Sequence, residues 1–358
     1  MKKPIALLNQ SPSICAIDFG SKNFKFVVGR QIGVDIEVDL LKKEPMGLGQ
    51  DLLDHDGSLS EAKLGQIKTV LSEFKDYCDS NAISTILGIG TSAIRSAKNQ
   101  EQASALIRSF GIIFEVAQGK REGQVSYLAV TNGAPNQLVS DMGSRSFQYA
   151  YKLETAAGGT HLSQATDSPG KNKEDQIINK VTQISAVLSD QSMDCAMHTP
   201  PAAVSGVKEG ESIESFSLKS GYLLAFAEHF ERADTFADAR RSFRRQLKRH
   251  IESLPKKTDI YIALASNTMA AYIAGGAKLD VVNQFLWKKV LLGKIDYLKE
   301  LKRHDYKLIL HNTPKINKIF PGLVFVEYML EHSGHDKVLI AEAELPAGLI
   351  VEHFLKTR

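Results

Sequence analysis

Short apolar runs bounded by turn residues alternate along the chain with longer segments of helical periodicity. The runs at 14–17 and 24–28 are joined by a Gly/Ser/Asn turn, which predicts a β-hairpin. Strict alternation over 34–40 predicts a third strand. We expect further strands at 83–89, 112–116, 137–143, 259–265 and 337–341. We expect helices from residue 60, over 119–130, 235–254 and 348–355, and over most of 278–333. Strands that alternate with helices indicate an α/β fold.

Residues 155–212 break this pattern, because they are polar and rich in turn residues at both ends. Only 177–188 has the apolar spacing of a helix. We interpret the segment as an insertion with a central helix, or alternatively as a long decorated hairpin.

Length and composition narrow the class of protein. At about 100–200 residues per domain, 358 residues predict about two domains. Three widely spaced cysteines exclude a disulfide scaffold or a four-thiolate zinc site, and free thiols fit the cytoplasm. The first apolar run is too short for a signal peptide, and no apolar stretch is long enough to span a membrane. A net charge of +3 does not by itself indicate a nucleic-acid partner.

Two turns share a design suited to phosphate. Asp18-Phe19-Gly20-Ser21-Lys22-Asn23 and Asp141-Met142-Gly143-Ser144-Arg145-Ser146 each place Asp at the end of a strand, with Gly and Ser following. Glycine lets backbone N–H groups approach an anion, serine adds a hydroxyl, and the aspartate can hold a divalent cation. Each turn alone is also compatible with an ordinary hairpin closed by an Asx-type turn.

These residues also carry a family resemblance. Residues 16–25 resemble the first motif of the exopolyphosphatase/guanosine pentaphosphate phosphohydrolase (Ppx/GppA) family, and 91–99 resemble its second motif, including Arg95 and Asn99. Residues 115–123 are similar to its third segment and 139–143 to its second phosphate loop. The resemblance is specific over 14–150 and thinner from 213 onward.

The resemblance implies an actin-like fold of two lobes, each ribonuclease-H-like, with a mixed sheet flanked by helices. We expect lobe one to comprise residues 1–118 and 346–358, and lobe two 119–345. It also implies an interlobe cleft that binds Mg²⁺ and polyphosphate or guanosine polyphosphate (pppGpp or ppGpp). The residues expected to contact phosphate are Gly20, Ser21, Lys22, Asn23, Thr91, Ser92, Arg95, Arg121, Gly143, Ser144, Arg145 and Ser146. Asp18 and Asp141 are the expected metal ligands.

Several positions depart from the family pattern. The family's catalytic Glu aligns with Arg121, leaving the neighbouring Glu122 as the candidate base. A shift of one residue on a helix rotates a side chain by about 100°, which is poor geometry for a replacement. Two glycines of the second loop are Ser144 and Arg145, and its terminal Glu is Gln148. Fewer carboxylates and more arginines predict a site that binds phosphate oxygens but holds metal poorly.

Three functions are therefore open. The preferred one is a protein that binds a phosphate chain or guanosine polyphosphate, with hydrolysis weak or lost. The second is an active Mg²⁺-dependent hydrolase with Glu122 as base and Arg95 as phosphate clamp. The third is a non-catalytic protein that docks a partner. We expect no membrane association and no nucleic-acid partner, and the apolar helices over 278–333 suggest a homodimer.

A further segment, residues 240–249, is rich in basic side chains. Arg240, Arg241, Arg244, Arg245, Lys248 and Arg249 recur at helical spacing and form a basic stripe. It could hold a polyanion that leaves the cleft, or nucleic acid, but a solvated helix face paired with nearby acidic residues is the interpretation we favour. No aromatic residues are interleaved as in single-strand nucleic-acid binding.

Overall fold

The computed structural model describes residues 12–33, 35–143, 146–154, 212–251, 254–256, 258–264, 285–302, 305, 316–341 and 343–357. The chain divides into two compact units. The described part of the first unit comprises 12–133 and 343–357, and that of the second comprises 134–154 and residues from 212 to 341.

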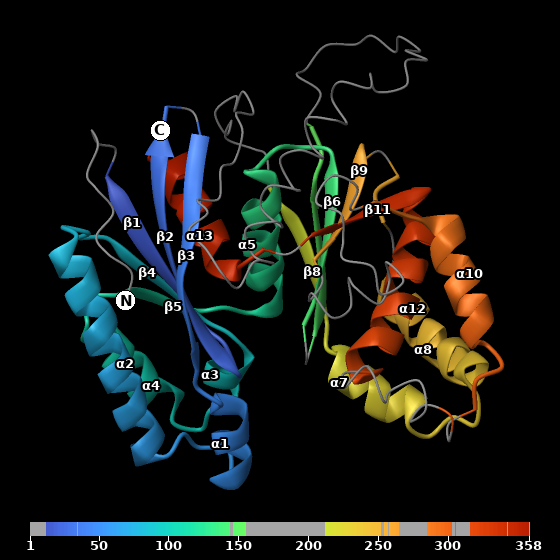
Figure 1. Cartoon of the computed structure of the whole chain (residues 1–358), viewed down its shortest axis with the longest axis horizontal. Helices are drawn as coiled ribbons and strands as arrows, with labels where there is room; N and C mark the ends of the chain where they lie inside the picture. The colour runs from blue at the N-terminus through green and yellow to red at the C-terminus, as the bar shows by residue number, and fades with distance from the viewer. Residues whose placement is uncertain are drawn as a thin grey trace. The chain divides into compact units, whose positions relative to one another are not determined.

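The first unit is built on a five-stranded sheet in the order β3-β2-β1-β4-β5 (Figure 1). Its strands are β1 (Ser13–Phe19), β2 (Asn23–Ile32), β3 (Asp35–Pro45), β4 (Ile86–Gly90) and β5 (Ile113–Val116). The first three form an antiparallel meander, and β4 and β5 run parallel to β1. Because β1, β4 and β5 are parallel, their carboxyl ends meet at one edge of the sheet.

Helices cover both faces of this sheet (Figure 1). They are α1 (Leu48–Asp54), α2 (Glu61–Ser80), α3 (Ser92–Ser96), α4 (Gln100–Arg108), α5 (Gly119–Thr131) and α13 (Leu345–Lys356). The Ser60 side chain caps α2 by accepting the N–H of Lys63 at 3.1 Å. The apolar face of α2 buries Ile67, Leu71 and Phe74 in a core shared with the sheet.

Helix α5 belongs to the first unit, so this unit extends beyond the boundary expected at residue 118. The reason is its close packing against α13. Gly348 of α13 lies so near the Val125 carbonyl of α5 that a Cβ at Gly348 would clash with it. The two helices therefore approach more closely than any other residue type would allow.

The second unit contains a six-stranded sheet in the order β10-β11-β9-β6-β7-β8. Its strands are β6 (Gln137–Met142), β7 (Phe147–Lys152), β8 (Glu214–Leu218), β9 (Ile260–Leu264), β10 (Phe285–Trp287) and β11 (Lys337–Ala341). Here β6, β7 and β8 form the antiparallel meander, and β9 and β11 run parallel to β6. The pattern is that of the first sheet, with β10 added as an antiparallel edge strand.

The described helices of the second unit are α7 (Tyr222–Ala225), a π-helical turn η1 (Phe226–Phe230), α8 (Phe236–His250), α10 (Lys288–Leu298) and α12 (Ile316–Ser333). Helices α8 and α12 pack on the sheet through an aromatic core (Figure 1). Phe147 of β7 lies 4.5 Å from Phe325 and 6.2 Å from Phe243 between ring centroids. The core thus joins the strand of the second hairpin to both helices.

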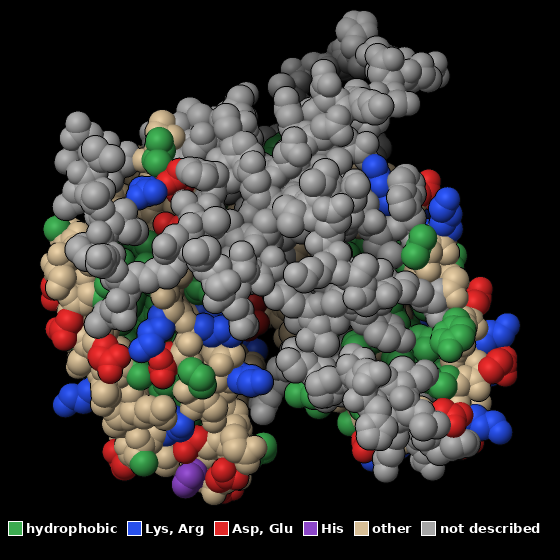
Figure 2. Space-filling model, in the orientation of Figure 1, with side chains coloured by type: hydrophobic (Ala, Val, Ile, Leu, Met, Phe, Trp, Pro, Cys, Tyr) green, Lys and Arg blue, Asp and Glu red, His purple; other side chains and the backbone are tan. Residues whose placement is uncertain are grey.

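Most of the elements expected from the sequence are confirmed. The structure adds α1, β7 and the short strand β10, which pairs with β11. The described residues within 278–333 are otherwise mostly helical, as expected. Of the insertion expected at 155–212, residues 155–211 lie outside the described residues. No described helix is long and apolar enough to cross a membrane. Figure 2 shows acidic and basic side chains intermixed on the face it presents.

Candidate phosphate-binding site

The two predicted phosphate turns close two matching hairpins. In the first, Asp18 of β1 lies opposite Lys25 of β2, and in the second, Asp141 of β6 lies opposite Gln148 of β7. A Cβ on Gly20 would lie 2.8 Å from the Asn23 carbonyl oxygen. A Cβ on Gly143 would lie at the same 2.8 Å from the Ser146 carbonyl oxygen. Both turns therefore require glycine for the same steric reason.

The first turn is held by the chain that follows β3. The Lys22 carbonyl accepts the N–H groups of Met46 and Gly47, both at 2.9 Å, and the Ser21 carbonyl accepts the N–H of Gly49 at 2.9 Å. These three hydrogen bonds stabilise the conformation of the turn. The Ser21 hydroxyl then lies 2.9 Å from the hydroxyl of Ser92, in the first turn of α3. The structure thus brings together Ser21 and Ser92 from two separate motifs.

Arg95 joins a third segment to this edge of the sheet. Its Nη1 donates to the Ala117 carbonyl and to Glu122 Oε1, both at 2.5 Å. The Arg95 and Glu122 side chains are 25% and 13% exposed, so the pair is mostly shielded from water. Charge-assisted hydrogen bonds of this kind are among the strong ones in proteins. Ser21, Ser92, Arg95 and Glu122 therefore lie along the carboxyl edge of β1, β4 and β5.

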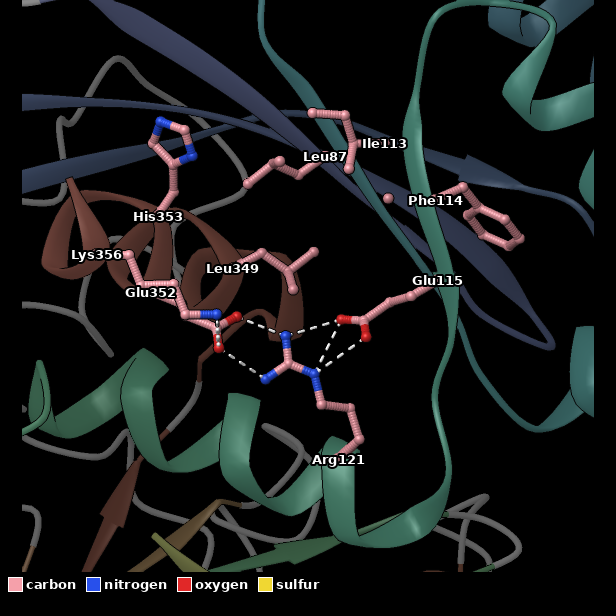
Figure 3. A pocket seen from close by; sticks show the side chains of 10 residues that line it. Leu87, Ile113, Phe114, Glu115, Arg121, Leu349, Glu352, His353 and Lys356 are labelled. Atoms are coloured by element: carbon pink, nitrogen blue, oxygen red, sulfur yellow. Dashed lines mark hydrogen bonds and ion pairs between the residues drawn. The ribbon is translucent and has the colours of Figure 1, made fainter. Parts of the chain in front are cut away.

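Arg121 makes a different set of contacts, shown in Figure 3. Its Nε and Nη2 donate to Glu115 Oε1 at 2.9 and 2.8 Å. Its Nη1 and Nη2 donate to Glu352 Oε1 and Oε2 at 3.1 and 2.5 Å. Lys356 also pairs with Glu352, at 2.9 Å. The guanidinium thus ties β5, α5 and α13 together, and both its sides face carboxylates.

This ion-pair group forms one wall of a cavity of about 290 Å³ in the first unit (Figure 3). Leu87, Ile113, Phe114 and Leu349 supply its apolar wall. Burial alone lowers the pKa of Arg121, but hydrogen bonds to Glu352 and Glu115 outweigh that effect and raise it. For Glu352, burial raises the pKa, and the bonds from Arg121 and Lys356 outweigh it and lower the pKa below its usual value. Both charged forms are thereby stabilised.

The remaining residues predicted to contact phosphate lie in different surroundings. Lys22 is exposed, and Asn23 and Thr91 are half-buried near the first turn. Asn99, part of the second motif, donates to the Leu59 carbonyl at 2.9 Å and accepts the Leu59 N–H at 2.8 Å, so it fixes a loop. Gly143 and Ser146 flank the second turn, and Ser144 and Arg145 lie outside the described residues.

The donor set offers little to a resident metal ion. Asp18 is buried in the first unit, and Asp141 is half-buried in the second. Among the described residues no group of three or more His, Cys, Asp or Glu side chains is arranged to hold a metal. Near the second turn, the Gln148 amide nitrogen donates to the Ser146 hydroxyl at 2.6 Å. The described donors thus do not form a preassembled Mg²⁺ cage.

Part of the chain matches a known protein family. The sequence model of the Ppx/GppA phosphatase family matches residues 32–155. These residues are therefore similar to a Ppx/GppA phosphatase domain. This match includes the segments that hold Ser92, Arg95 and Glu122, and it confirms the resemblance seen in the sequence motifs. A search of curated proteins finds no match.

Solved structures agree over nearly the whole length. A crystal structure of a Ppx/GppA family member from Aquifex aeolicus is 19% identical, with 98% of this chain and 99% of that chain covered and a TM-score of 0.70. An exopolyphosphatase from Cytophaga hutchinsonii is 16% identical, with coverages of 96% and 98% and a TM-score of 0.59. A nucleoside triphosphate hydrolase from Neospora caninum is 12% identical, with coverages of 97% and 93% and a TM-score of 0.52. The actin-like fold expected from the sequence is confirmed.

Sequence reasoning did not foresee the partners of Arg121. Glu352 is 231 positions away in the chain, and no periodicity links it to α5. Glu115 could have been predicted as a partner from the sequence, because it lies near the end of β5 only six positions before Arg121. A carboxylate and an arginine that flank a strand-to-helix turn are a signal for a pair of this kind.

Proposed function

We propose that this protein binds a phosphate chain, as polyphosphate or a guanosine polyphosphate, at the carboxyl edge of the first sheet, and hydrolyses it weakly or not at all. Ser21 and Ser92 supply hydroxyl donors, and Arg95 supplies the cation. Gly20 allows backbone N–H groups to approach the anion. Arg121 has a structural role in this proposal, because two carboxylates already neutralise it.

One observation carries the proposal: Arg95 is bound to Glu122 at 2.5 Å. A general base must reach the attacking water at about 2.6–3.2 Å with an available lone pair. Glu122 Oε1 instead points to a guanidinium. Phosphate that enters beside Ser92 competes with Glu122 for Arg95. In this proposal Arg95 exchanges the Glu122 carboxylate for a phosphate group.

A second candidate is an active Mg²⁺-dependent hydrolase, and the position of Glu122 favours it. This carboxylate lies in the first turn of α5, at the same edge as Ser21 and Ser92. Phosphate that displaced it from Arg95 would leave it next to the substrate. In this case Asp18 of the first unit would offer a carboxylate to Mg²⁺, and the ion would neutralise phosphate oxygens.

The proposal also includes a compartment and an assembly. Cys15 and Cys78 are buried free thiols, which fits a reducing cytoplasm. We also expect a homodimer through the apolar helices of the second unit, and light scattering with mass determination measures it directly.

The binding step is tested by calorimetry with tripolyphosphate. We expect Arg95→Gln to weaken binding about tenfold to a hundredfold, because a charged hydrogen bond contributes about 1.5–3 kcal/mol. The matched control is Arg108→Gln, since Arg108 is an exposed arginine of the same unit that pairs with Glu101. Equal affinities of the wild type and Arg95→Gln would contradict the proposed site.

A further inference from the structure

Helix α8 carries six Lys or Arg side chains, and the structure divides them into two sets. Arg240 and Arg244 face α12. Arg240 Nε donates to Glu327 at 2.9 Å, and Arg244 pairs with Glu327 at 3.3 Å and with Glu331. Glu327 is only 3% exposed, so these two arginines neutralise a buried carboxylate. They are part of the packing between α8 and α12.

The second set is exposed. It comprises Arg241, Arg245, Lys248 and Arg249, which we call the α8 stripe. Residues four and seven or eight positions apart lie on one side of a helix, and the stripe extends about 12 Å at 1.5 Å per residue. Asp238 lies 3.7 Å from Arg241. Within the part of the chain that the structure describes, Arg245, Lys248 and Arg249 have no ion-pair partner.

The stripe also lacks aromatic side chains. The phenylalanines of α8, Phe236 and Phe243, are fully buried in the core. Proteins that bind single-stranded nucleic acid stack bases on exposed aromatic rings, and the α8 stripe offers none. Its chemistry is a row of cations with no base-reading group, which suits an anion that consists of phosphate alone.

We propose that the α8 stripe is a second binding surface, whose ligand is long-chain inorganic polyphosphate. The ligand class rests on the proposed function, whereas the stripe lies on the second unit and uses none of the residues of the first site. A flexible polyanion can place one phosphate group at each cation along the stripe. Tripolyphosphate is too short to reach all four. The stripe therefore makes affinity depend on chain length.

The test uses the full chain and the double variant Arg245→Gln/Lys248→Gln. We expect affinity for long-chain sodium polyphosphate to fall at least about tenfold near 0.1 M salt. The slope of log affinity against log salt is expected to decrease by about one for each cation removed. Affinity for tripolyphosphate should stay unchanged. The variant Arg245→Lys/Lys248→Arg keeps both charges and should bind as the wild type does.

The matched control is Lys289→Gln/Lys299→Gln, which removes two exposed charges from the same unit. An equal loss in this control would overturn the proposal, because it would show attraction by net charge alone. Competition by a single-stranded oligonucleotide at equal phosphate concentration, lost in the α8 variant, would overturn it in favour of nucleic acid. Loss of long-chain binding in the α8 variant, with no effect of Arg95→Gln on tripolyphosphate, would support the stripe and contradict the first site. The reverse result would contradict the stripe alone.

Discussion

The two hairpins of this protein have the same backbone design but different chemistry. Each places Asp at the end of its first strand and a glycine at the same close approach to a carbonyl three residues on. Each turn is also held by the chain after the third strand. Met46 and Gly47 donate to the Lys22 carbonyl in the first unit, and Tyr222 donates to the Gly143 carbonyl at 3.1 Å in the second.

The difference lies in the residue opposite each aspartate and in what surrounds the turn. Opposite Asp18 is Lys25, which pairs with Glu344, and the turn adjoins Ser92 and Arg95. Opposite Asp141 is Gln148, whose amide bonds the Ser146 hydroxyl of its own turn. The two hairpins therefore share the geometry of the turn but differ in the charged and polar groups around it.

The largest expected effect is that of Gln148→Glu, which restores the carboxylate of the family pattern. Gln148 is 2% exposed, and a charge buried beside Asp141 is costly. We expect the second unit to lose about 2–3 kcal/mol of unfolding free energy. Urea unfolding followed by the fluorescence of Trp287, the single tryptophan and part of β10, measures this unit.

The control for that variant is Gln66→Glu, an exposed change on α2 beside Lys63, whose Nζ lies 2.7 Å from the Gln66 side chain. It should leave the fluorescence transition unchanged. A neutral result for Gln148→Glu would mean that the second hairpin tolerates charge as the first does. Recovery of stability on adding Mg²⁺ would show that the second turn holds the ion, and it would contradict the expectation of a site that holds metal poorly.

A smaller effect is expected from the two turn glycines. Gly20→Ala and Gly143→Ala each force a methyl group against a backbone carbonyl at the same distance. We expect each to destabilise its own unit by about 1–2 kcal/mol. Circular dichroism and Trp287 fluorescence follow the transitions. Gly65→Ala is the control, since no atom lies within 4 Å of its added Cβ, and it should be stabilising. Clearly unequal losses of unfolding free energy in Gly20→Ala and Gly143→Ala would contradict the steric equivalence of the two turns.

The smallest effects concern pH, and they separate the two units. Burial lowers the pKa of His335, so its folded state favours the neutral ring. The stability of the second unit should fall as pH decreases below the unfolded value of 6.5. The bonds from Arg121 and Lys356 keep the pKa of Glu352 below 4.5, so its contribution holds above that pH and is lost on further acidification.

Both effects are expected as changes in the slope of the unfolding free energy against pH. Unfolding measured from about pH 7 to about pH 3 tests both. His335→Gln should flatten the dependence just below pH 6.5 in the fluorescence transition. Arg121→Gln should flatten the dependence below pH 4.5 in the circular dichroism signal of the first unit. Identical pH profiles for both units in all three proteins would contradict this assignment.

Elements with strong local signals are predictable from the sequence. The hairpin of β1 and β2, the capped helix α2 and the buried strand β9 all follow from periodicity and turn residues within the segment itself. The sequence reasoning missed β7 and β10, which exist through pairing with other strands. The short strand β10 gains its hydrogen bonds from β11, which lies far along the chain, and local propensity does not report such a pair.

The sequence predicted individual residues of the candidate site but not the contacts between their side chains. Ser21, Ser92 and Arg95 came from motif residues, and the structure brings them together at one edge. Glu115 lies only six positions before Arg121, but no local pattern indicated that Glu352 would bind the other side of this guanidinium. An arginine that replaces a carboxylate can make a site more positive, but here the nearby carboxylates cancel that charge. Long-range ion pairs of this kind depend on tertiary packing.

Anion exchange on Arg95 is best tested by the variant Glu122→Gln, with phosphate-chain binding and phosphate release measured on the same sample. If Glu122 competes with the ligand for Arg95, its neutralisation should raise affinity for tripolyphosphate about threefold to tenfold. The low rate of phosphate release should not change. Unchanged affinity with release reduced by about a hundredfold or more, the size expected for loss of a general base, would contradict the proposed exchange.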